Sequence, residues 1–175
     1  GKLDPQVVPW LFELGLMGIE IPEEHGGAGA SFFMSVLAIE EIARGSLSLA
    51  ACAAMQSLMG THFLFALGSD EIRDRLLAPA LRGEKFGTIC ITEPGSGSAA
   101  TSITTTAVKK GGKYVLNGVK HWITGGGVST ALLIFAQVEE NGEWLGIGGF
   151  LALRGAGGGR KIGLSSPALW LRGHA

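Results

Sequence analysis

The hydrophobic pattern of this chain changes period at about Lys85, and this change constrains the fold more than any other feature. Before it, apolar residues recur at helical spacing, and serine and glycine mark the ends of the runs. After it, short segments rich in β-branched and aromatic residues follow one another. The pattern predicts an α+β chain with two domains: an all-α helical domain at residues 1–84, then an antiparallel β domain at residues 85–175.

Four helices are expected in the first domain, and serine residues begin two of them. Ser31 caps the second helix, over residues 32–44, whose apolar residues cover much of its circumference and predict burial on more than one side. The third helix, over residues 49–67, is rich in alanine and nearly lacks charge. Ser69 caps the fourth.

Six strands are expected in the second domain. They are residues 86–92, 104–108, 114–116, 119–124, 131–138 and 147–153. Asn117-Gly118 is a strong hairpin signal and is expected to join the third of these strands to the fourth. Glu140-Asn141-Gly142 marks a second turn, and Leu169-Trp170-Leu171 predicts one further strand.

Composition and charge exclude several classes of function. A net charge of −1 gives no electrostatic case for binding nucleic acid or an anionic membrane surface. No signal peptide or membrane span is visible, because Gln56, Gly60 and His62 interrupt the longest apolar run. Cys52 and Cys90 lie in apolar runs and indicate buried thiols in a reducing compartment, not a disulfide or a metal site.

The polar loop at residues 92–98 follows an apolar strand and contains Gly95, Gly97 and Ser98. Glycine lets backbone N–H groups approach an anion closely, and the serine adds a hydroxyl. The loop is not a P-loop, since no Gly-Lys-Ser/Thr follows it. Two interpretations remain open: an ordinary turn after a strand, or a loop that binds a phosphate or cofactor.

Trp122 and Thr124 are expected to project from the same side of the strand at residues 119–124. There the indole could stack on a flat ring while threonine hydroxyls bond the edge of that ring. The alternative is an aromatic core residue beside solvated threonines. No catalytic base, nucleophilic triad or metal-ligand spacing can be assembled from the sequence.

Four segments resemble signatures of the acyl-CoA dehydrogenase family, in the same order. The segment from Met17 to Gly27 resembles its G-x-x-x-P-E-x-x-G-G segment, and Glu40-Glu41-Ile42-Ala43 resembles its E-E-[IL]-[AS] helix. Residues 91–98 are similar to its signature T-E-P-G-A-G-S-D. Residues 114–124 resemble its Y-x-[IL]-N-G-x-K-x-[WF]-I-[TS] segment, and the similarity runs from about Leu11 to Ser166.

This resemblance implies a helical N-terminal domain, a β-barrel-like middle domain, and a C-terminal four-helix bundle that the chain lacks. Family enzymes hold FAD between the middle domain and the bundle. They oxidise an acyl-CoA thioester between its α and β carbons and pass the electrons to an electron-transfer flavoprotein. The catalytic glutamate is expected in the bundle, so no catalytic residue is assigned here and the isolated fragment is expected to be inactive.

The resemblance also implies a set of binding residues. Those expected to contact FAD are Ile89, Ile91, Thr92, Gly97, Ser98, Trp122 and Thr124. Thr92 would donate to the pyrimidine edge of the flavin, Thr124 would approach N5, and Trp122 would cover one face. Those expected near the substrate are Ser98, Ala50, Ala51, Ala54 and Leu58. Small side chains there leave room for a branched or longer acyl chain, and the region at residues 29–32 resembles the short/branched-chain branch.

Further expectations follow from the same resemblance. The full-length parent is expected to be a homotetramer or homodimer in a bacterial cytoplasm or the mitochondrial matrix. Ala99 departs from the family, which usually has aspartate after Gly-Ser, and residues 170–175 diverge from its Val-Pro ending. Two rivals keep the fold: a flavin monooxygenase or nitroalkane oxidase that reacts with oxygen, and a non-catalytic acyl-CoA-dehydrogenase-like scaffold.

Overall fold

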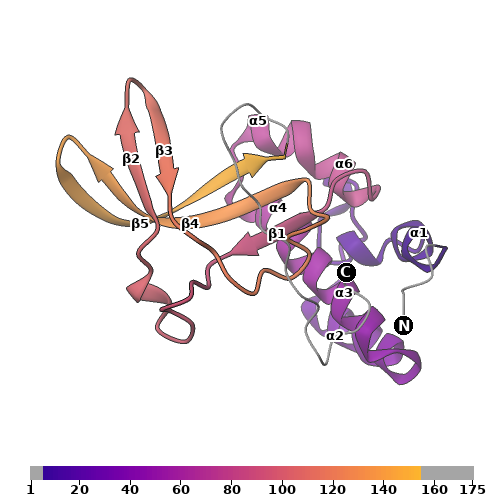
Figure 1. The fold of residues 1–175 in the computed structure, drawn as a ribbon. Helices are drawn as coiled ribbons and strands as arrows, with labels where there is room; N and C mark the ends of the chain where they lie inside the picture. The colour runs from indigo at the N-terminus through magenta and orange to yellow at the C-terminus, as the bar shows by residue number, and fades with distance from the viewer. Residues whose placement is uncertain (1–5, 155–175) are drawn as a thin grey trace.

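A computed structural model describes residues 6–154, in which helices pack beside a curled β-sheet (Figure 1). The helices are α1 (Val7–Glu13), α2 (Phe32–Gly45), α3 (Leu47–Gln56), α4 (Phe63–Leu67), α5 (Asp70–Ile72) and α6 (Ala78–Leu81). The strands are β1 (Gly87–Cys90), β2 (Thr106–Lys110), β3 (Lys113–Asn117), β4 (Ala131–Glu140) and β5 (Glu143–Leu153). The expected order, helices first and then a β domain, is confirmed. The strand expected at Leu169-Trp170-Leu171 lies outside the described residues.

The helices begin where the sequence indicates. The side chains of Ser31 and Ser69 each accept a hydrogen bond from a backbone N–H three residues later, which satisfies one of the free donors of a helix start. The expected third helix is continuous but changes winding, because the π-helical segment η3 (Ser57–His62) joins α3 to α4. A second π-helical segment, η4 (Arg73–Leu77), joins α5 to α6.

Two apolar clusters hold the helical part together. One contains Ile21, Leu64, Leu76, Leu77 and Ala80, and the other contains Leu11, Met17 and Ala53. From α2, only Ile39 and Ile42 pack against the second cluster. Phe32 and Phe33 are 71% and 67% exposed, so the prediction that α2 is buried on more than one side is wrong within the described chain.

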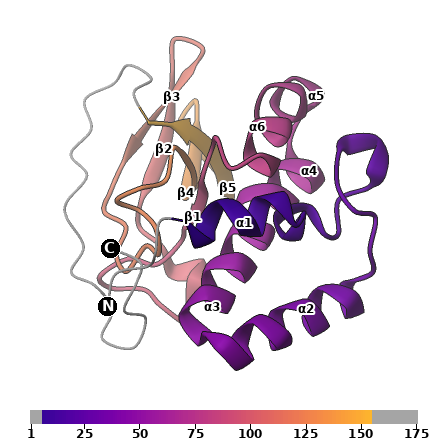
Figure 2. The same ribbon diagram turned by 90° about the vertical axis from the view of Figure 1, so that its right-hand side faces the viewer.

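Strand β4 is the centre of the sheet. Along one edge it pairs in parallel first with β1 and then with β2, and along the other edge it pairs antiparallel with β5. Strand β3 pairs antiparallel with β2. The sheet is therefore mixed, which corrects the expectation of a wholly antiparallel one. The two hairpins, β2–β3 and β4–β5, extend away from the helices (Figure 1), and Figure 2 shows the helices gathered beside and below the sheet.

One hairpin signal was correct and the other was wrong. Asn141 and Gly142 adopt φ of 53° and 85° and join β4 to β5, as expected. The β2–β3 turn is instead made by Gly111 and Gly112, with φ of 54° and 76°. No strand forms at residues 119–124, so Asn117-Gly118 ends β3 and does not begin a hairpin.

The helical part meets the sheet through a close contact between η3 and β1. Gln56 is buried; its amide nitrogen donates to the Lys85 carbonyl at 3.3 Å, and its amide oxygen accepts from the Gly87 N–H at 3.3 Å. A Cβ at Gly87 would lie 2.6 Å from the Cα of Gly60 and 2.9 Å from the Met59 carbonyl oxygen. Glycine is thus required where the strand meets the helix backbone.

The helix from Leu47 to Leu67 has 21 residues and a mean hydropathy of 1.3, which by length and composition alone would allow it to cross a membrane. Two of its polar side chains, those of Gln56 and Thr61, are buried and bonded within the protein. Thr61 is fully buried and donates to the carbonyl oxygens of Met17, at 2.5 Å, and Ser57, at 2.7 Å. This bonding is typical of a helix packed against other segments of its own chain.

The contact between η3 and β1 predicts that Gly87→Ala destabilises the chain. Since the atoms in the way are backbone atoms, the strand must shift, and such overpacking costs about 1–3 kcal/mol of unfolding free energy. Urea denaturation would measure the loss. Gly45→Ala is the control, because no atom lies within 4 Å of a Cβ placed there; equal effects from both substitutions would contradict the proposed cause.

Candidate functional site

Buried and half-buried side chains alternate along strand β1. Thr88 and Cys90 are 3% and 5% exposed and face the interior. Ile89 and Ile91 alternate with them and are half-buried. The predicted flavin-facing isoleucines therefore lie together on the more open side.

The loop at residues 92–98 is compact and leaves its glycines uncovered. Glu93 and Ser96 exchange backbone hydrogen bonds of 2.9 and 3.1 Å, and the Ser96 hydroxyl donates to the Ala99 carbonyl at 2.6 Å. A Cβ at Gly95 or Gly97 would meet no atom within 4 Å, and neither residue has a positive φ. Neither packing nor conformation requires glycine here, and the absence of side chains leaves the backbone open to close approach by a bound group.

Residues 118–124, called the strap below, lie directly against this loop. The His121 N–H donates to the Thr92 carbonyl at 2.8 Å, and the Lys120 ammonium donates to the Ile91 carbonyl at 2.8 Å. At the far end of the strap, the Thr88 hydroxyl donates to the Thr124 carbonyl at 2.6 Å. Two segments about thirty residues apart in the sequence are thus joined side by side.

Trp122 adopts an unusual conformation within the strap. Its φ is 58°, in the left-handed region that bulky residues avoid at a cost of about 1–3 kcal/mol. The indole is 64% exposed and stacks on the ring of His121 with centroids 4.5 Å apart. The expected strand alternation of Trp122 and Thr124 is wrong, but the structure still presents an exposed aromatic surface on the strap, one residue after the His121 N–H that bonds the Thr92 carbonyl.

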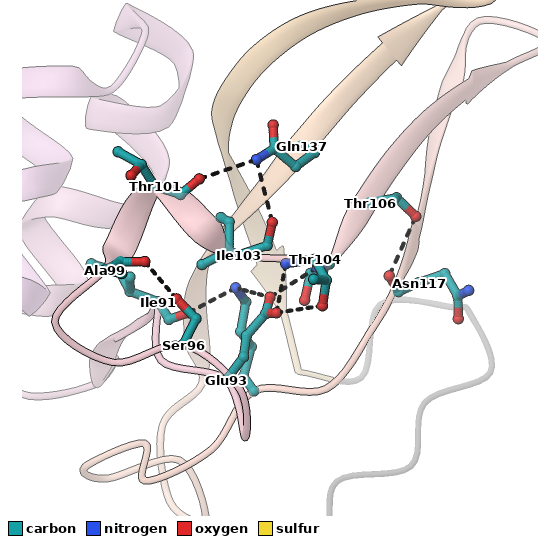
Figure 3. A network of polar contacts seen from close by, with 12 residues as sticks. Ile91, Glu93, Ser96, Ala99, Thr101, Ile103, Thr104, Thr106, Asn117 and Gln137 are labelled. Atoms are coloured by element: carbon teal, nitrogen blue, oxygen red, sulfur yellow. Dashed lines mark hydrogen bonds and ion pairs between the residues drawn. The ribbon is translucent and has the colours of Figure 1, made fainter.

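The carboxylate of Glu93 is the centre of a buried polar network (Figure 3). It accepts hydrogen bonds from the Thr104 N–H at 2.6 Å, the Thr104 hydroxyl at 2.7 Å and the Thr105 N–H at 2.9 Å. The Lys120 ammonium completes the network at 2.9 Å. Only 4% of the Glu93 side chain and 11% of the Lys120 side chain are exposed, so this is a buried ion pair.

The charge state of this network is fixed by its hydrogen bonds. Burial on its own would raise the pKa of the Glu93 carboxyl, but hydrogen bonds from Thr105, Lys120 and Thr104 outweigh it and hold that pKa well below its usual range. Glu93 is therefore ionised at neutral pH. Because it already accepts four hydrogen bonds, it does not act as a general base.

Cys90 lies near this network but is not reactive. Burial raises the pKa of its thiol to about 11, although the nearby Lys120 ammonium lowers it slightly. The burial of Cys90 agrees with the interpretation of its sequence context, whereas Cys52 is half-buried.

Three hydroxyls near the strap and loop are available to a bound group. Within residues 6–154, the side chains of Thr92, Ser98 and Thr124 have no hydrogen-bond partner. Thr92 and Thr124 are half-buried and Ser98 is exposed. Together with the indole of Trp122 and the uncovered glycines, this arrangement suits a flat ring with a polar edge that is attached to an anionic group.

A cavity of about 370 Å³ lies between the long helix and the strap, bordered by Thr124. From the helix it is lined by Cys52, Met55, Gln56 and Met59. The described lining does not include the predicted substrate residues Ala50, Ala51, Ala54 and Leu58; Ala50 is buried elsewhere and Leu58 is 51% exposed. Other residues of the same helix line this cavity, and the role of the four predicted residues stays a prediction.

Sequence reasoning missed the two residues that join loop and strap, Glu93 and Lys120. The sequence did contain an indication of this pair, because Glu93 and Lys120 are single charged residues beside segments that carry no formal charge. Charged residues in such positions are buried only when they are paired.

Comparison with known proteins identifies the family. Residues 1–84 match the N-terminal domain of acyl-CoA dehydrogenases and residues 88–166 match the middle domain. The chain belongs to the acyl-CoA dehydrogenase family, as its sequence motifs implied.

Curated relatives and solved structures agree with this assignment. The chain is 51% identical over 130 residues to benzylmalonyl-CoA dehydrogenase of Aromatoleum aromaticum, covering 74% of the chain and 34% of that protein. It is 39% identical over 150 residues to the mitochondrial short/branched chain specific acyl-CoA dehydrogenase of Bos taurus, covering 86% and 34%. The fold matches a glutaryl-CoA dehydrogenase from Mycobacterium smegmatis in complex with FADH2, with a TM-score of 0.79 and 27% identity over 87% of this chain and 38% of that one. The chain thus spans about one third of the length of these curated relatives.

The Glu93 network predicts a specific pH dependence of stability. The pKa of the Glu93 carboxyl in the folded chain lies below the value of about 4.3 expected in the unfolded chain. The stability contributed by the ionised carboxylate is therefore complete above about pH 4.3 and is lost as pH falls through the folded pKa. We expect the unfolding free energy of the wild-type chain to exceed that of Glu93→Gln most above about pH 5, with the difference shrinking at lower pH. Urea denaturation between pH 3 and pH 7 would measure this, and a difference that grows on acidification would contradict it.

Proposed function

We propose that this chain forms the N-terminal and middle domains of an FAD-dependent acyl-CoA dehydrogenase. The parent enzyme would oxidise an acyl-CoA thioester between its α and β carbons and pass the electrons to an electron-transfer flavoprotein. The observation that carries the proposal is the bond from the His121 N–H to the Thr92 carbonyl, because it holds the loop beside the segment that carries Trp122. We propose that the loop and the strap are the part of the FAD site that this chain contributes.

The residues present fit a flavin. A bound FAD needs an aromatic or apolar surface against its ring, hydroxyl donors at the ring edge, and accessible backbone N–H groups near its pyrophosphate. Trp122 offers an exposed indole, Thr92 and Thr124 offer unpaired hydroxyls, and Gly97 leaves its backbone open. Bound FAD would supply the acceptor for the substrate hydride.

The roles of the chain's own residues follow from their positions. Thr92 would donate a hydrogen bond to the polar edge of the flavin, where charge gathers on reduction. The indole of Trp122 would cover one flavin face and exclude water from it. Ser98 and the backbone at Gly97 would hold the pyrophosphate, and Ile89 and Ile91 would form the apolar floor.

For the substrate, we propose a short or branched acyl group. A relative at 39% identity is named for short and branched chains, and one at 51% identity is named for benzylmalonyl-CoA. The cavity of about 370 Å³ beside Thr124 offers apolar room, lined by Met55 and Met59, for such a group. We further propose a homotetrameric or homodimeric parent in a bacterial cytoplasm or the mitochondrial matrix.

Spectroscopy of the parent protein tests the function. We expect flavin absorbance bands that bleach anaerobically when acyl-CoA is added and return with an electron-transfer flavoprotein. We expect the isolated 175-residue chain not to oxidise acyl-CoA with a dye acceptor. Oxygen consumption without bleaching by acyl-CoA would favour a flavin monooxygenase, and absence of flavin in the parent would favour a non-catalytic scaffold.

The contact proposed for Trp122 predicts weaker FAD binding by Trp122→Ala. Loss of a stacked aromatic pair costs about 0.5–1.5 kcal/mol beyond the buried area, so the dissociation constant should rise about tenfold. Titration of the apoprotein with FAD would measure it. Trp144→Ala is the matched control, since Trp144 is 56% exposed on β5, and an equal loss of affinity there would count against the site.

A further inference from the structure

The loop and the strap touch through very few polar contacts. Two of the three bonds that reach residues 91–93 from the strap come from a single ammonium group, that of Lys120, which binds the Ile91 carbonyl and the Glu93 carboxylate. The third is the backbone bond between His121 and Thr92. Remove Lys120, and one backbone bond holds the two segments at this point.

Glu93 extends this connection to the sheet. Its carboxylate binds the backbone of Thr104 and Thr105, just before β2, at 2.6 and 2.9 Å. The strap leaves β3 at Gly118, where a Cβ would lie 2.3 Å from the Thr105 hydroxyl oxygen. One carboxylate therefore ties together the loop after β1, the entry to β2 and, through Lys120, the strap that leaves β3 (Figure 3).

The pair is more deeply buried than the residues that flank it. The side chains of Glu93 and Lys120 are 4% and 11% exposed. The residues that flank them are the more open ones: Thr92 is half-buried and Trp122 is 64% exposed. The pair thus acts on the surface of the site through its neighbours.

We propose that Glu93 and Lys120 are positioning residues, whose ion pair sets the spacing between Thr92 and Trp122 across which the flavin binds. This inference rests on the proposed function for its ligand. Trp122 supports it independently, because its left-handed backbone persists only where neighbouring contacts force it. Lys120, two residues earlier in the strap, provides such a contact.

The first test needs no cofactor. Hydrogen exchange of the 175-residue chain, followed by NMR, reports how often the bond between the His121 N–H and the Thr92 carbonyl opens. In Glu93→Gln and Lys120→Met we expect exchange at His121 to accelerate about tenfold or more, and by more than at the Ala131 N–H, bonded to Phe86, which reports the loss of global stability. Unchanged exchange at His121 would overturn the proposal.

The second test reads the geometry at the bound flavin in the parent protein. A stacked indole quenches flavin fluorescence, so displacement of Trp122 should make the FAD complex more fluorescent at saturation, as Trp122→Phe should also do. We expect this brightening in Glu93→Gln and Lys120→Met, with dissociation constants for FAD raised about tenfold. Lys109→Met, which breaks an ion pair with Glu140 on the hairpins, is the control and should do neither.

The outcomes separate the two proposals. If both variants lose thermal stability but bind FAD with wild-type affinity and fluorescence, the pair is only structural and the inference is wrong. If the unaltered parent binds no FAD, the proposed function fails, while exchange at His121 still decides whether the pair joins loop and strap. Should Lys120→Met not fold, Glu93→Gln decides, since it keeps the shape of the side chain and removes only its charge.

Discussion

The burial of one carboxylate, that of Glu93, organises the β part of this molecule. A buried charge is tolerated only when its lone pairs are satisfied and a counter-charge is close. Thr104 and Thr105 supply backbone donors and Lys120 supplies the cation, so each must lie within hydrogen-bond distance of one point. Three separate segments converge there, because moving any one of them away would leave a buried polar or charged group without its partner. A hydrophobic contact in the same place would define the spacing far less sharply, since it has no preferred direction.

This constraint explains how the strap keeps a costly conformation. A tryptophan with φ of 58° would relax in a free loop, but Lys120 and His121 are both bonded to the loop after β1. The cost of about 1–3 kcal/mol is offset by contacts outside the strained residue. What results is a large aromatic side chain left 64% exposed at a fixed place, which hydrophobicity alone would oppose. Such an arrangement is typical of a surface shaped for another molecule.

Local signals in the sequence predicted the helices, the serine caps and the turn at Asn141-Gly142, because each depends on residues that are neighbours in the chain. The hairpin at Asn117-Gly118 was predicted by equally local chemistry and is wrong. Glycine is required at position 118 because the backbone there packs against Thr105, and this contact cannot be predicted from neighbouring residues in the sequence. Parallel pairing of β4 with β1 and β2 is likewise a long-range property, and alternation cannot distinguish it from antiparallel pairing.

In the candidate site, too, some features could be predicted from neighbouring residues and others depend on long-range contacts. Ile89 and Ile91 could be placed on one side of β1 from alternation alone, whereas Trp122 was grouped with them through family resemblance, and the strand assumed for Trp122 does not form. Along the long helix, Cys52, Met55, Gln56 and Met59 line the cavity, and a π-helical turn begins directly after Gln56. A π-turn adds one residue without changing composition, so its effect is invisible to propensity. Met59, within that turn, lines the cavity while the adjacent Leu58 is 51% exposed, and the shape of the cavity beside Thr124 therefore depends on backbone winding as much as on side-chain identity.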